Sequence, residues 1–127
     1  MATPEAVEIS DGYKDAIVQS NGEDTVYTSV FDIVQGLPWP EGIAGRVRRN
    51  RFTHKWHGRE DEVRAKREQL APVLMAAEQQ HDIEQSAIYM GQSAAFVKQV
   101  RPAADVMRNI CEDAERILRE RPAAILG

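Results

Sequence analysis

A single segment of this sequence has the composition of a β-strand. Residues 25–33 (TVYTSVFDI) are rich in β-branched and aromatic side chains, and no other run in the chain is comparable. A lone strand cannot satisfy its own backbone hydrogen bonds, because the groups along its edges need a second strand. Either the segment pairs with a strand that this sequence does not reveal, which would point to missing sequence, or it is an extended or helical piece. In both cases we expect a mainly α fold.

The chain length sets a second limit. A β/α barrel typically needs about 250 residues, whereas this chain has 127, of which 43% are hydrophobic and 28% charged. The sequence is therefore that of one ordinary soluble domain, and a self-contained barrel enzyme is excluded. It contains neither an apolar run of the roughly 20 residues that cross a bilayer nor a secretory signal in residues 1–5, so we expect a cytoplasmic protein without membrane contact. The only cysteine, Cys111, permits no internal disulfide and is expected to be buried on a helix face.

Helix-start and helix-stop signals predict several helices. Residues 3–5 (TPE) predict a short first helix, since threonine suits the N-cap, proline the first turn and glutamate the helix dipole. Asp11 is expected to cap a second helix that ends at residues 21–22 (NG), a pair suited to positive φ. Residues 60–80 predict a long helix that Pro72 kinks or divides.

The clearest helical signal lies near the end of the sequence. After a short turn and helix start at residues 88–93, we expect a helix over residues 102–119 that is the longest regular element and is closed by Pro122. Opposite charges stand four residues apart on one side of it, at 112 with 116 and at 115 with 119. The other side carries an apolar stripe, which predicts a one-sided packing element rather than a coiled coil: Ala103, Val106, Met107, Ile110, Cys111, Ala114, Ile117 and Leu118.

Charge is distributed in blocks along the chain. Residues 5–41 carry eight acids and one base, whereas residues 46–59 carry six bases and no acid. The basic block could hold single-stranded nucleic acid if its arginines pair with phosphates while Phe52 and Trp56 stack on bases. The sequence pI near 5.4 argues against a nucleic-acid-binding domain. The alternative is that the arginines pair with the acidic N-terminal third, or pack under a stiff Pro- and Gly-containing loop at residues 36–42.

Other candidate sites give weaker signals. No phosphate-cradling glycine loop occurs among the eight glycines. His54 and His57 could share a helix face but lack the third ligand that zinc needs, so we predict no metal site. His81 stands beside an aspartate, yet no nucleophile accompanies it, and an exposed loop histidine is expected. Residues 91–93 (GQS) either place N–H groups around an anion or a polar ring edge, or simply use Ser93 as an N-cap.

Several ordered blocks of the sequence carry a family resemblance. Residues 89–94 (YMGQSA) are followed by residues 101–104 (RPAA) and the last helix. Five blocks precede them: residues 2–6 (ATPEA), 13–17 (YKDAI), 36–40 (GLPWP), 49–52 (RNRF) and 56–60 (WHGRE). In this order they resemble the carboxyl-terminal portion of nitronate monooxygenases, flavoenzymes once called 2-nitropropane dioxygenases, over nearly the whole chain.

The resemblance implies an FMN-binding β/α (TIM) barrel with a mostly helical substrate domain inserted late and a last helix that returns to the barrel. On that pattern residues 1–88 are the insert and residues 89–127 are the turn and the returning helix, while the barrel itself is largely absent. The family's phosphate loops and catalytic histidine precede this chain, so it contains no assigned catalytic residue. The positions that match a stretch approaching the flavin are Tyr89, Gly91, Gln92 and Ser93, although Met90 departs from the small residue usual there.

Three hypotheses for function follow. The first is a fragment of an FMN-dependent nitronate monooxygenase, which oxidises alkyl nitronates with O2 to a carbonyl compound and nitrite; we expect this chain alone to be inactive and not to retain FMN. The second is a free-standing helical interaction module that docks on a separate barrel chain or on itself. The third, which the composition disfavours, is nucleic-acid binding through the segment between Arg46 and Lys55.

Overall fold

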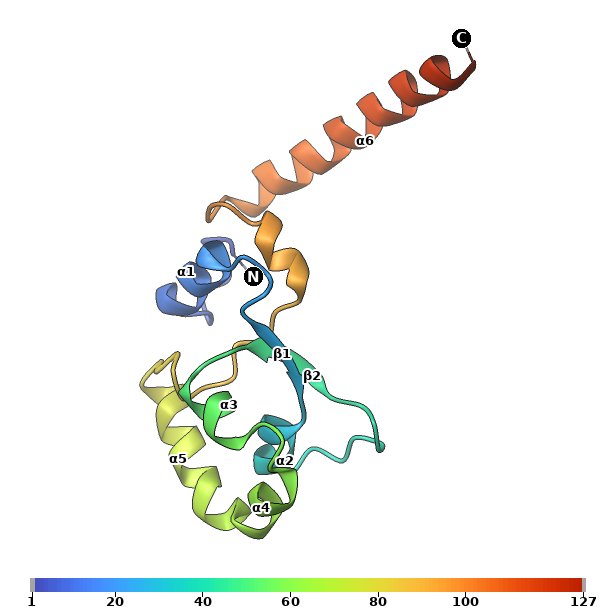
Figure 1. Ribbon diagram of the computed structural model, residues 1–127. Helices are drawn as coiled ribbons and strands as arrows, with labels where there is room; N and C mark the ends of the chain where they lie inside the picture. Colours follow the sequence, from blue (N-terminus) through green and yellow to red (C-terminus); the bar gives the residue numbers. More distant parts are fainter. Residues whose placement is uncertain (1, 127) are drawn as a thin grey trace.

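The protein consists of a small body of helices and strands from which one long helix projects (Figure 1). The computed structural model describes residues 2–126, and side chains for residues 2–122. The fold is mostly helical with a small sheet, as predicted. Its elements in chain order are α1 (Asp11–Gln19), β1 (Thr25–Thr28), α2 (Val30–Gln35), β2 (Gly45–Arg48), α3 (Arg51–Trp56), α4 (Glu60–Ala65), α5 (Arg67–Gln79), the 3₁₀ helix η1 (Gln92–Phe96) and α6 (Ala103–Leu126).

The strand predicted from composition finds its partner within the chain. β1 pairs antiparallel with β2, and Val26 lies opposite Val47. The other edge of β2 receives the extended residues 88–90 through backbone hydrogen bonds of 2.9 and 3.1 Å, where Val47 bridges to Tyr89. The expectation of a partner outside this sequence is therefore wrong. The partner was hidden in the basic block, where residues 45–48 (GRVR) alternate charged and apolar side chains as a half-buried strand does.

Only the first part of the predicted strand is extended. After Thr28 the chain turns into α2, in which five consecutive residues, 30–34, are buried. This short helix packs against both α4 and α5, so its side chains are covered in several directions at once. Burial by the neighbouring helices thus overrides the β propensity of these residues.

The main core lies between the sheet and helices α2–α5. The rings of Phe31 and Phe52 stack with centroids 4.7 Å apart, and Trp56 lies 6.4 Å from Phe52. Three cationic side chains lie 4.9 to 5.5 Å from the centroid of the Trp56 ring, which closes this end of the core. The buried members of the core are Val26, Val30, Phe31, Ile33, Val34, Val47, Phe52, Trp56, Val63 and Leu74.

The helix predicted over residues 60–80 is divided at Lys66, not at Pro72. Lys66 ends α4 and precedes α5, with φ −105° and ψ 11°. Pro72 lies inside α5 on its exposed side, where it removes one backbone donor without interrupting the helix. The division at Lys66 lets Val63 of α4 and Leu74 of α5 enter the same core from two helix directions.

A second, smaller core joins the N-terminal third to the segment after residue 87. Its buried members are Ala16, Ile17, Ile88, Met90 and Ala94, and α1 packs here against η1. The helix predicted near Asp11 is confirmed, but Ser10 is its N-cap, since the Ser10 side chain accepts from the Tyr13 amide at 3.3 Å. α1 ends at Gln19 with Ser20 as an extended C-cap, slightly before the predicted stop at residues 21–22, although Gly22 has the expected positive φ, +83°.

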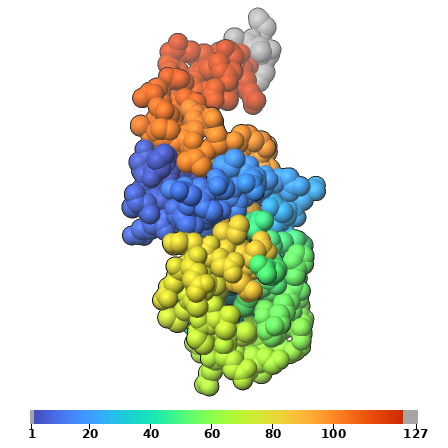
Figure 2. All heavy atoms as spheres, turned by 90° about the vertical axis from the view of Figure 1, so that its left-hand side faces the viewer, coloured from blue at the N-terminus to red at the C-terminus, as the bar shows by residue number. Residues whose placement is uncertain are grey.

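The short helix predicted from residues 3–5 does not form. Residues 3–9 make turns, and the carboxylate of Glu5 instead accepts from the backbone N–H of Ala103 at 3.1 Å, at the start of α6. Hydrogen bonds from the backbone amides of Glu5 and Ala103 lower the pKa of this carboxyl group. Glu5 therefore stabilises the start of another helix rather than its own. Figure 2 shows the N-terminal residues between the orange base of α6 and the green and yellow main body.

α6 is the longest element, as predicted, with 24 residues. It runs through Pro122, so the expectation that this proline closes the helix is wrong. Proline lacks a backbone N–H, and its ring conflicts with the carbonyl four residues earlier, but near a helix end these two effects disturb few turns. Of the predicted charge pairs, Glu115 with Arg119 is present, whereas Arg116 pairs with Asp113 at 2.9 Å and with Glu120 at 3.4 Å instead of with residue 112.

Most of the apolar stripe of α6 faces solvent. Among the residues that the structure describes, only the first turn of α6 is partly covered, at Ala103 and Val106. The stripe residues from 107 to 118 are exposed, including Cys111, so the prediction that Cys111 is buried is wrong. The reason is that α6 leaves the body after its first turn (Figure 1). None of the described helices combines the length and apolar character that crossing a bilayer requires.

Candidate functional site

The stretch predicted to approach a flavin lies at the junction of the two cores. Tyr89 belongs to the extended segment beside β2, and Gly91, Gln92 and Ser93 follow it at the surface. Gly91 occupies the N-cap position of η1, and no side chain caps this helix, so the alternative in which Ser93 is the N-cap is not observed. The helix expected here is a 3₁₀ helix of five residues.

A close backbone approach holds this stretch in place. Gly22 packs so tightly against it that a Cβ atom at this glycine would lie 2.5 Å from the carbonyl oxygen of Gln92. The turn that carries Gly22 is itself fixed, because Gly22 donates its N–H to Ser20 Oγ at 3.0 Å and accepts from Thr25 Oγ1 at 3.0 Å. The turn after α1 thus determines where Gln92 lies.

Substituting alanine for Gly22 tests this approach. We expect Gly22→Ala to lower the free energy of unfolding by about 2 kcal/mol, because it adds a clash with Gln92 to the strain of a positive φ. Gly42→Ala is the matched control, since Gly42 has φ +82° and nothing within 4 Å of its would-be Cβ. It should lose only about 1 kcal/mol in urea unfolding. Equal losses for the two variants would contradict the proposed clash.

Tyr89 connects the stretch to a buried carboxylate. Its phenol donates to Asp32 Oδ1 at 3.1 Å, and its backbone carbonyl accepts from the Tyr13 hydroxyl at 3.0 Å. Its ring lies over Gly45, where a Cβ atom would approach the ring to 2.6 Å. Burial and the negative charge of Asp32 raise the pKa of the Tyr89 phenol well above its usual value, so this group remains a neutral donor.

This raised pKa predicts a dependence of stability on alkaline pH. Below the usual tyrosine pKa of about 10 the phenol is protonated in both states; above it the unfolded chain loses the proton while the folded chain keeps it. The free energy of unfolding should therefore fall as the pH rises above about 10, with at most about 1.4 kcal/mol per pH unit from this one group. Urea unfolding over this range should show a smaller slope for Tyr89→Phe. Burial raises the pKa of Tyr13 as well, so Tyr13→Phe should remove a further part of the slope. An unchanged slope in Tyr89→Phe would contradict the assignment.

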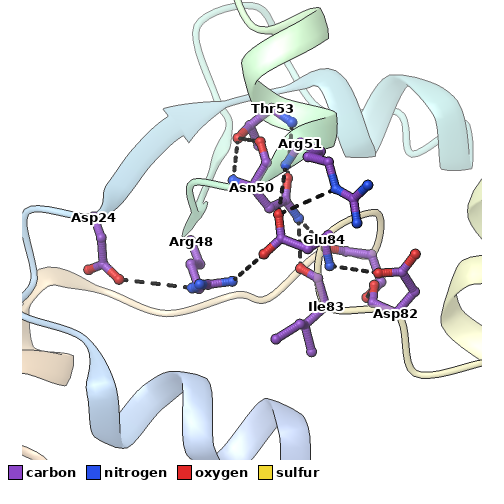
Figure 3. Close-up of polar contacts among 9 residues, drawn as sticks. Asp24, Arg48, Asn50, Arg51, Thr53, Asp82, Ile83 and Glu84 are labelled. Atoms are coloured by element: carbon purple, nitrogen blue, oxygen red, sulfur yellow. Dashed lines mark hydrogen bonds and ion pairs between the residues drawn. The ribbon is translucent and has the colours of Figure 1, made fainter.

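The arginines of the basic block are largely engaged within the fold. Arg48 lies between two acids, with its Nε 4.0 Å from Asp24 and a terminal nitrogen 3.2 Å from Glu84, while Arg51 Nε lies 3.8 Å from Glu84 (Figure 3). The pairing of Arg48 with Asp24 matches the expected contact with the acidic N-terminal third. Phe52 and Trp56 are buried in the main core, so neither ring is available to stack on a base.

A polar cluster that the sequence analysis missed surrounds Asn50. Its Oδ1 accepts from the Thr53 amide at 3.0 Å, and Thr53 Oγ1 accepts from the Asn50 amide at 2.8 Å, which forms a capping box for α3. Its Nδ2 donates to the carbonyls of Ile83 at 3.1 Å and Ser86 at 2.8 Å. Asn50 is buried, so one side chain ties α3 to the turn after α5 (Figure 3). The available signal was the spacing N-x-x-T at the start of a helix that buries Phe52 and Trp56.

The histidines do not assemble a metal centre. His54, His57 and His81 are all exposed, and His81 has φ +55° just after α5. In the described part of the chain no three histidine, cysteine, aspartate or glutamate residues are grouped as metal ligands would be. We therefore assign no metal-ligating role to them.

The residues near Gly91 do not form a complete FMN site by themselves. A flavin phosphate needs several convergent N–H donors, whereas η1 is a single short 3₁₀ turn whose Ala94 amide already donates to the Gly91 carbonyl at 3.0 Å. The Tyr89 hydroxyl is committed to Asp32. The assignment of Gly91, Gln92 and Ser93 as flavin-approaching residues stays a prediction.

Comparison with known proteins identifies the fold. No protein-family model and no curated protein matches the sequence. Among solved structures, FabK from Thermotoga maritima matches with a TM-score of 0.74 and 24% identity over 97% of this chain, which corresponds to 37% of FabK. A point mutant of the same FabK matches with a TM-score of 0.67 and 23% identity, again over 97% of this chain and 33% of that one. The chain thus has the fold of a segment spanning about a third of FabK.

Proposed function

We propose that this chain forms the substrate-domain portion and the closing helix of a flavin-dependent oxidoreductase built on a β/α barrel. The observation that carries the proposal is the agreement of fold, over 97% of the chain, with about a third of FabK, a flavin-dependent reductase. The ordered sequence blocks that resemble nitronate monooxygenases, from ATPEA to RPAA, support the same kind of enzyme. The exposed apolar stripe of α6 is what a helix that packs on a barrel would present.

Within such an enzyme the residues described above would have a positioning role. FMN would supply the redox chemistry when bound to the barrel. The hydrogen bond from Tyr89 to Asp32 holds residues 88–90 beside β2, and the close approach of Gly22 fixes Gln92. The dipeptide Gly91–Gln92 therefore lies at a defined place on the surface. We infer from the resemblance that Gly91 and Gln92 face the flavin.

Two reactions fit this class of enzyme. The sequence blocks favour oxidation of an alkyl nitronate by oxygen, with a nitronate or nitroalkane as the small-molecule substrate. The fold likeness to FabK, an enoyl-acyl-carrier-protein reductase, favours reduction of an enoyl thioester. We propose nitronate oxidation as the function, because the sequence blocks that resemble nitronate monooxygenases include residues 89–94, the stretch inferred to face the flavin. Enoyl reduction is the second candidate.

The chain by itself is expected to be colourless. After incubation with excess FMN and gel filtration, the protein peak should carry no flavin absorbance, because one short 3₁₀ turn cannot replace the phosphate loops of a barrel. No nitronate-dependent oxygen uptake should occur. A yellow protein with stoichiometric flavin would contradict this prediction and would mean that these residues assemble a phosphate site of their own.

A chimera separates the two candidate reactions. Replacing the matching third of Thermotoga maritima FabK with this chain should give a yellow protein that retains FMN, with unmodified FabK as the control. Oxygen uptake with the anion of 2-nitropropane would support nitronate oxidation, whereas oxidation of reduced nicotinamide dependent on an enoyl thioester would support the second candidate. A well-folded chimera that binds no FMN would contradict the proposed role of the chain.

A further inference from the structure

The loop between α2 and β2 borders two cavities outside the stretch discussed above. Tyr27 fixes this loop, since its hydroxyl donates to the Gly42 carbonyl at 3.3 Å and accepts from the Ala44 amide at 2.8 Å. At the start of the loop, the Leu37 amide donates to the Asp32 carbonyl at 2.9 Å. Trp39 is held on the loop with 59% of its surface exposed. In Figure 1 the loop stands out beyond the sheet.

The first cavity has a largely apolar lining and a volume of about 360 Å³. Its apolar walls come from the loop, and its polar walls come from α2 and the segment beside β2. The lining residues are Asp32, Gln35, Leu37, Trp39, Ile43, Ala44, Gly45 and Tyr89. A second cavity of about 380 Å³ shares Asp32, Leu37, Trp39 and Ile43 with it. The two cavities therefore meet at the Trp39 loop and at one carboxylate.

That carboxylate has an unsatisfied oxygen. Asp32 is only 5% exposed, and its Oδ1 accepts from Tyr89, but its Oδ2 is buried without a hydrogen-bond partner. A buried carboxylate oxygen without a donor is unfavourable, so a group that supplies an N–H there gains more than at the surface. No lysine or arginine lines the first cavity, whereas Arg64 lines the second, and the amide of Gln35 in the first already donates to Glu78 at 3.1 Å. The cavity thus combines a negative charge with an aromatic ring and aliphatic walls.

We propose that this cavity binds a small organic cation, namely a protonated primary amine on an aromatic or branched aliphatic body. The ammonium group pairs with the Asp32 carboxylate, and the apolar body packs against Leu37, Trp39 and Ile43. The face of the Trp39 ring contributes a cation–π interaction. Carboxylates and phosphates are disfavoured, because they would face Asp32 with like charge. The proposal stands independently of the function proposed above, since it uses no flavin and no barrel.

Titration of the whole chain with 2-phenylethylammonium tests the proposal, with 3-phenylpropionate as the ligand of similar shape and opposite charge. Calorimetry should show saturable binding of the amine and none of the carboxylate. Asp32→Asn keeps the size of the side chain but removes its charge, and should weaken amine binding about tenfold or more. Asp113→Asn on α6 removes the same charge far from the cavity and should leave the affinity unchanged.

The same titrations can overturn the proposal. Absence of amine binding, equal binding of both ligands, or equal affinity in Asp32→Asn would each do so. Circular dichroism verifies that Asp32→Asn is folded. If it is not, Trp39→Ala replaces it, because this exposed side chain can be truncated without opening the core, and it should also weaken amine binding. An unchanged affinity in Trp39→Ala would then count against the proposed site.

Discussion

Phe31→Ala is expected to lower the free energy of unfolding by about 3–5 kcal/mol, the largest effect of any substitution considered for this protein. Phe31 is 1% exposed, and its ring stacks on Phe52 at the centre of the main core. Truncation removes the apolar contacts of the ring and leaves a cavity between α2 and α3 that neighbours fill only in part. Urea or thermal unfolding followed by circular dichroism measures the loss.

Phe96→Ala is the matched control, because Phe96 is 85% exposed at the end of η1. Its substitution should change the free energy of unfolding by no more than about 0.5 kcal/mol. The described core would be wrong if Phe31→Ala cost less than about 1 kcal/mol, or if both substitutions cost the same.

Asn50→Ala is expected to cost about 3 kcal/mol, the second largest effect. The substitution removes the N-cap of α3, which is worth about 1 kcal/mol. It also leaves the carbonyls of Ile83 and Ser86 without their shared donor inside the fold, at about 1 kcal/mol each. Urea denaturation of the unsubstituted protein and of Asn50→Ala gives the difference between their free energies of unfolding.

Two further variants separate the parts of this effect. Asn50→Asp keeps the cap acceptor but places a carboxylate beside two carbonyl oxygens, so it should be at least as destabilising as alanine. Asn21→Ala removes an exposed asparagine whose side chain accepts only from the amides of Glu23 and Asp24, and should cost about 1 kcal/mol or less. A stable Asn50→Asp would show that the two carbonyl contacts contribute little.

The sequence was informative for several elements that local chemistry decides, although the helix-start signal at residues 3–5 and the stop signal at Pro122 failed. The last helix as the longest element, its pair of Glu115 with Arg119, the helix near Asp11 and the positive φ of Gly22 all follow from short-range rules and are confirmed. Contacts between distant residues decided the rest. Residues 30–34 form a helix because α4 and α5 bury them. The Glu5 carboxylate accepts from the Ala103 amide because the N-terminal residues lie beside the start of α6. No local pattern encodes either contact.

The candidate sites show the same division. Residues 91–93 gave a weak signal by their own chemistry, and Tyr89 was singled out only through the family resemblance. The structure of this stretch, a strand edge followed by a 3₁₀ turn, depends on β2 and Gly22. The basic block was visible as charge, but its pairing with Glu84 was not. Asp32 carries no sequence signal of a site, because the composition of residues 25–33 predicts a strand there and only the folded chain buries Asp32 beside Tyr89.

The exposed course of α6 means that the molecule contains two units that unfold separately. We expect the body to unfold as a cooperative whole, because residues 88–90 contribute side chains to both of its cores. Between residues 107 and 122, the side chains that the structure describes are exposed, and α6 is stabilised there by its own backbone and by pairs such as Arg116 with Asp113. We therefore expect this part of α6 to follow the helix–coil equilibrium of a single peptide. A free energy of unfolding measured on this chain therefore belongs to the body, while the helical signal of α6 melts gradually over a broad range.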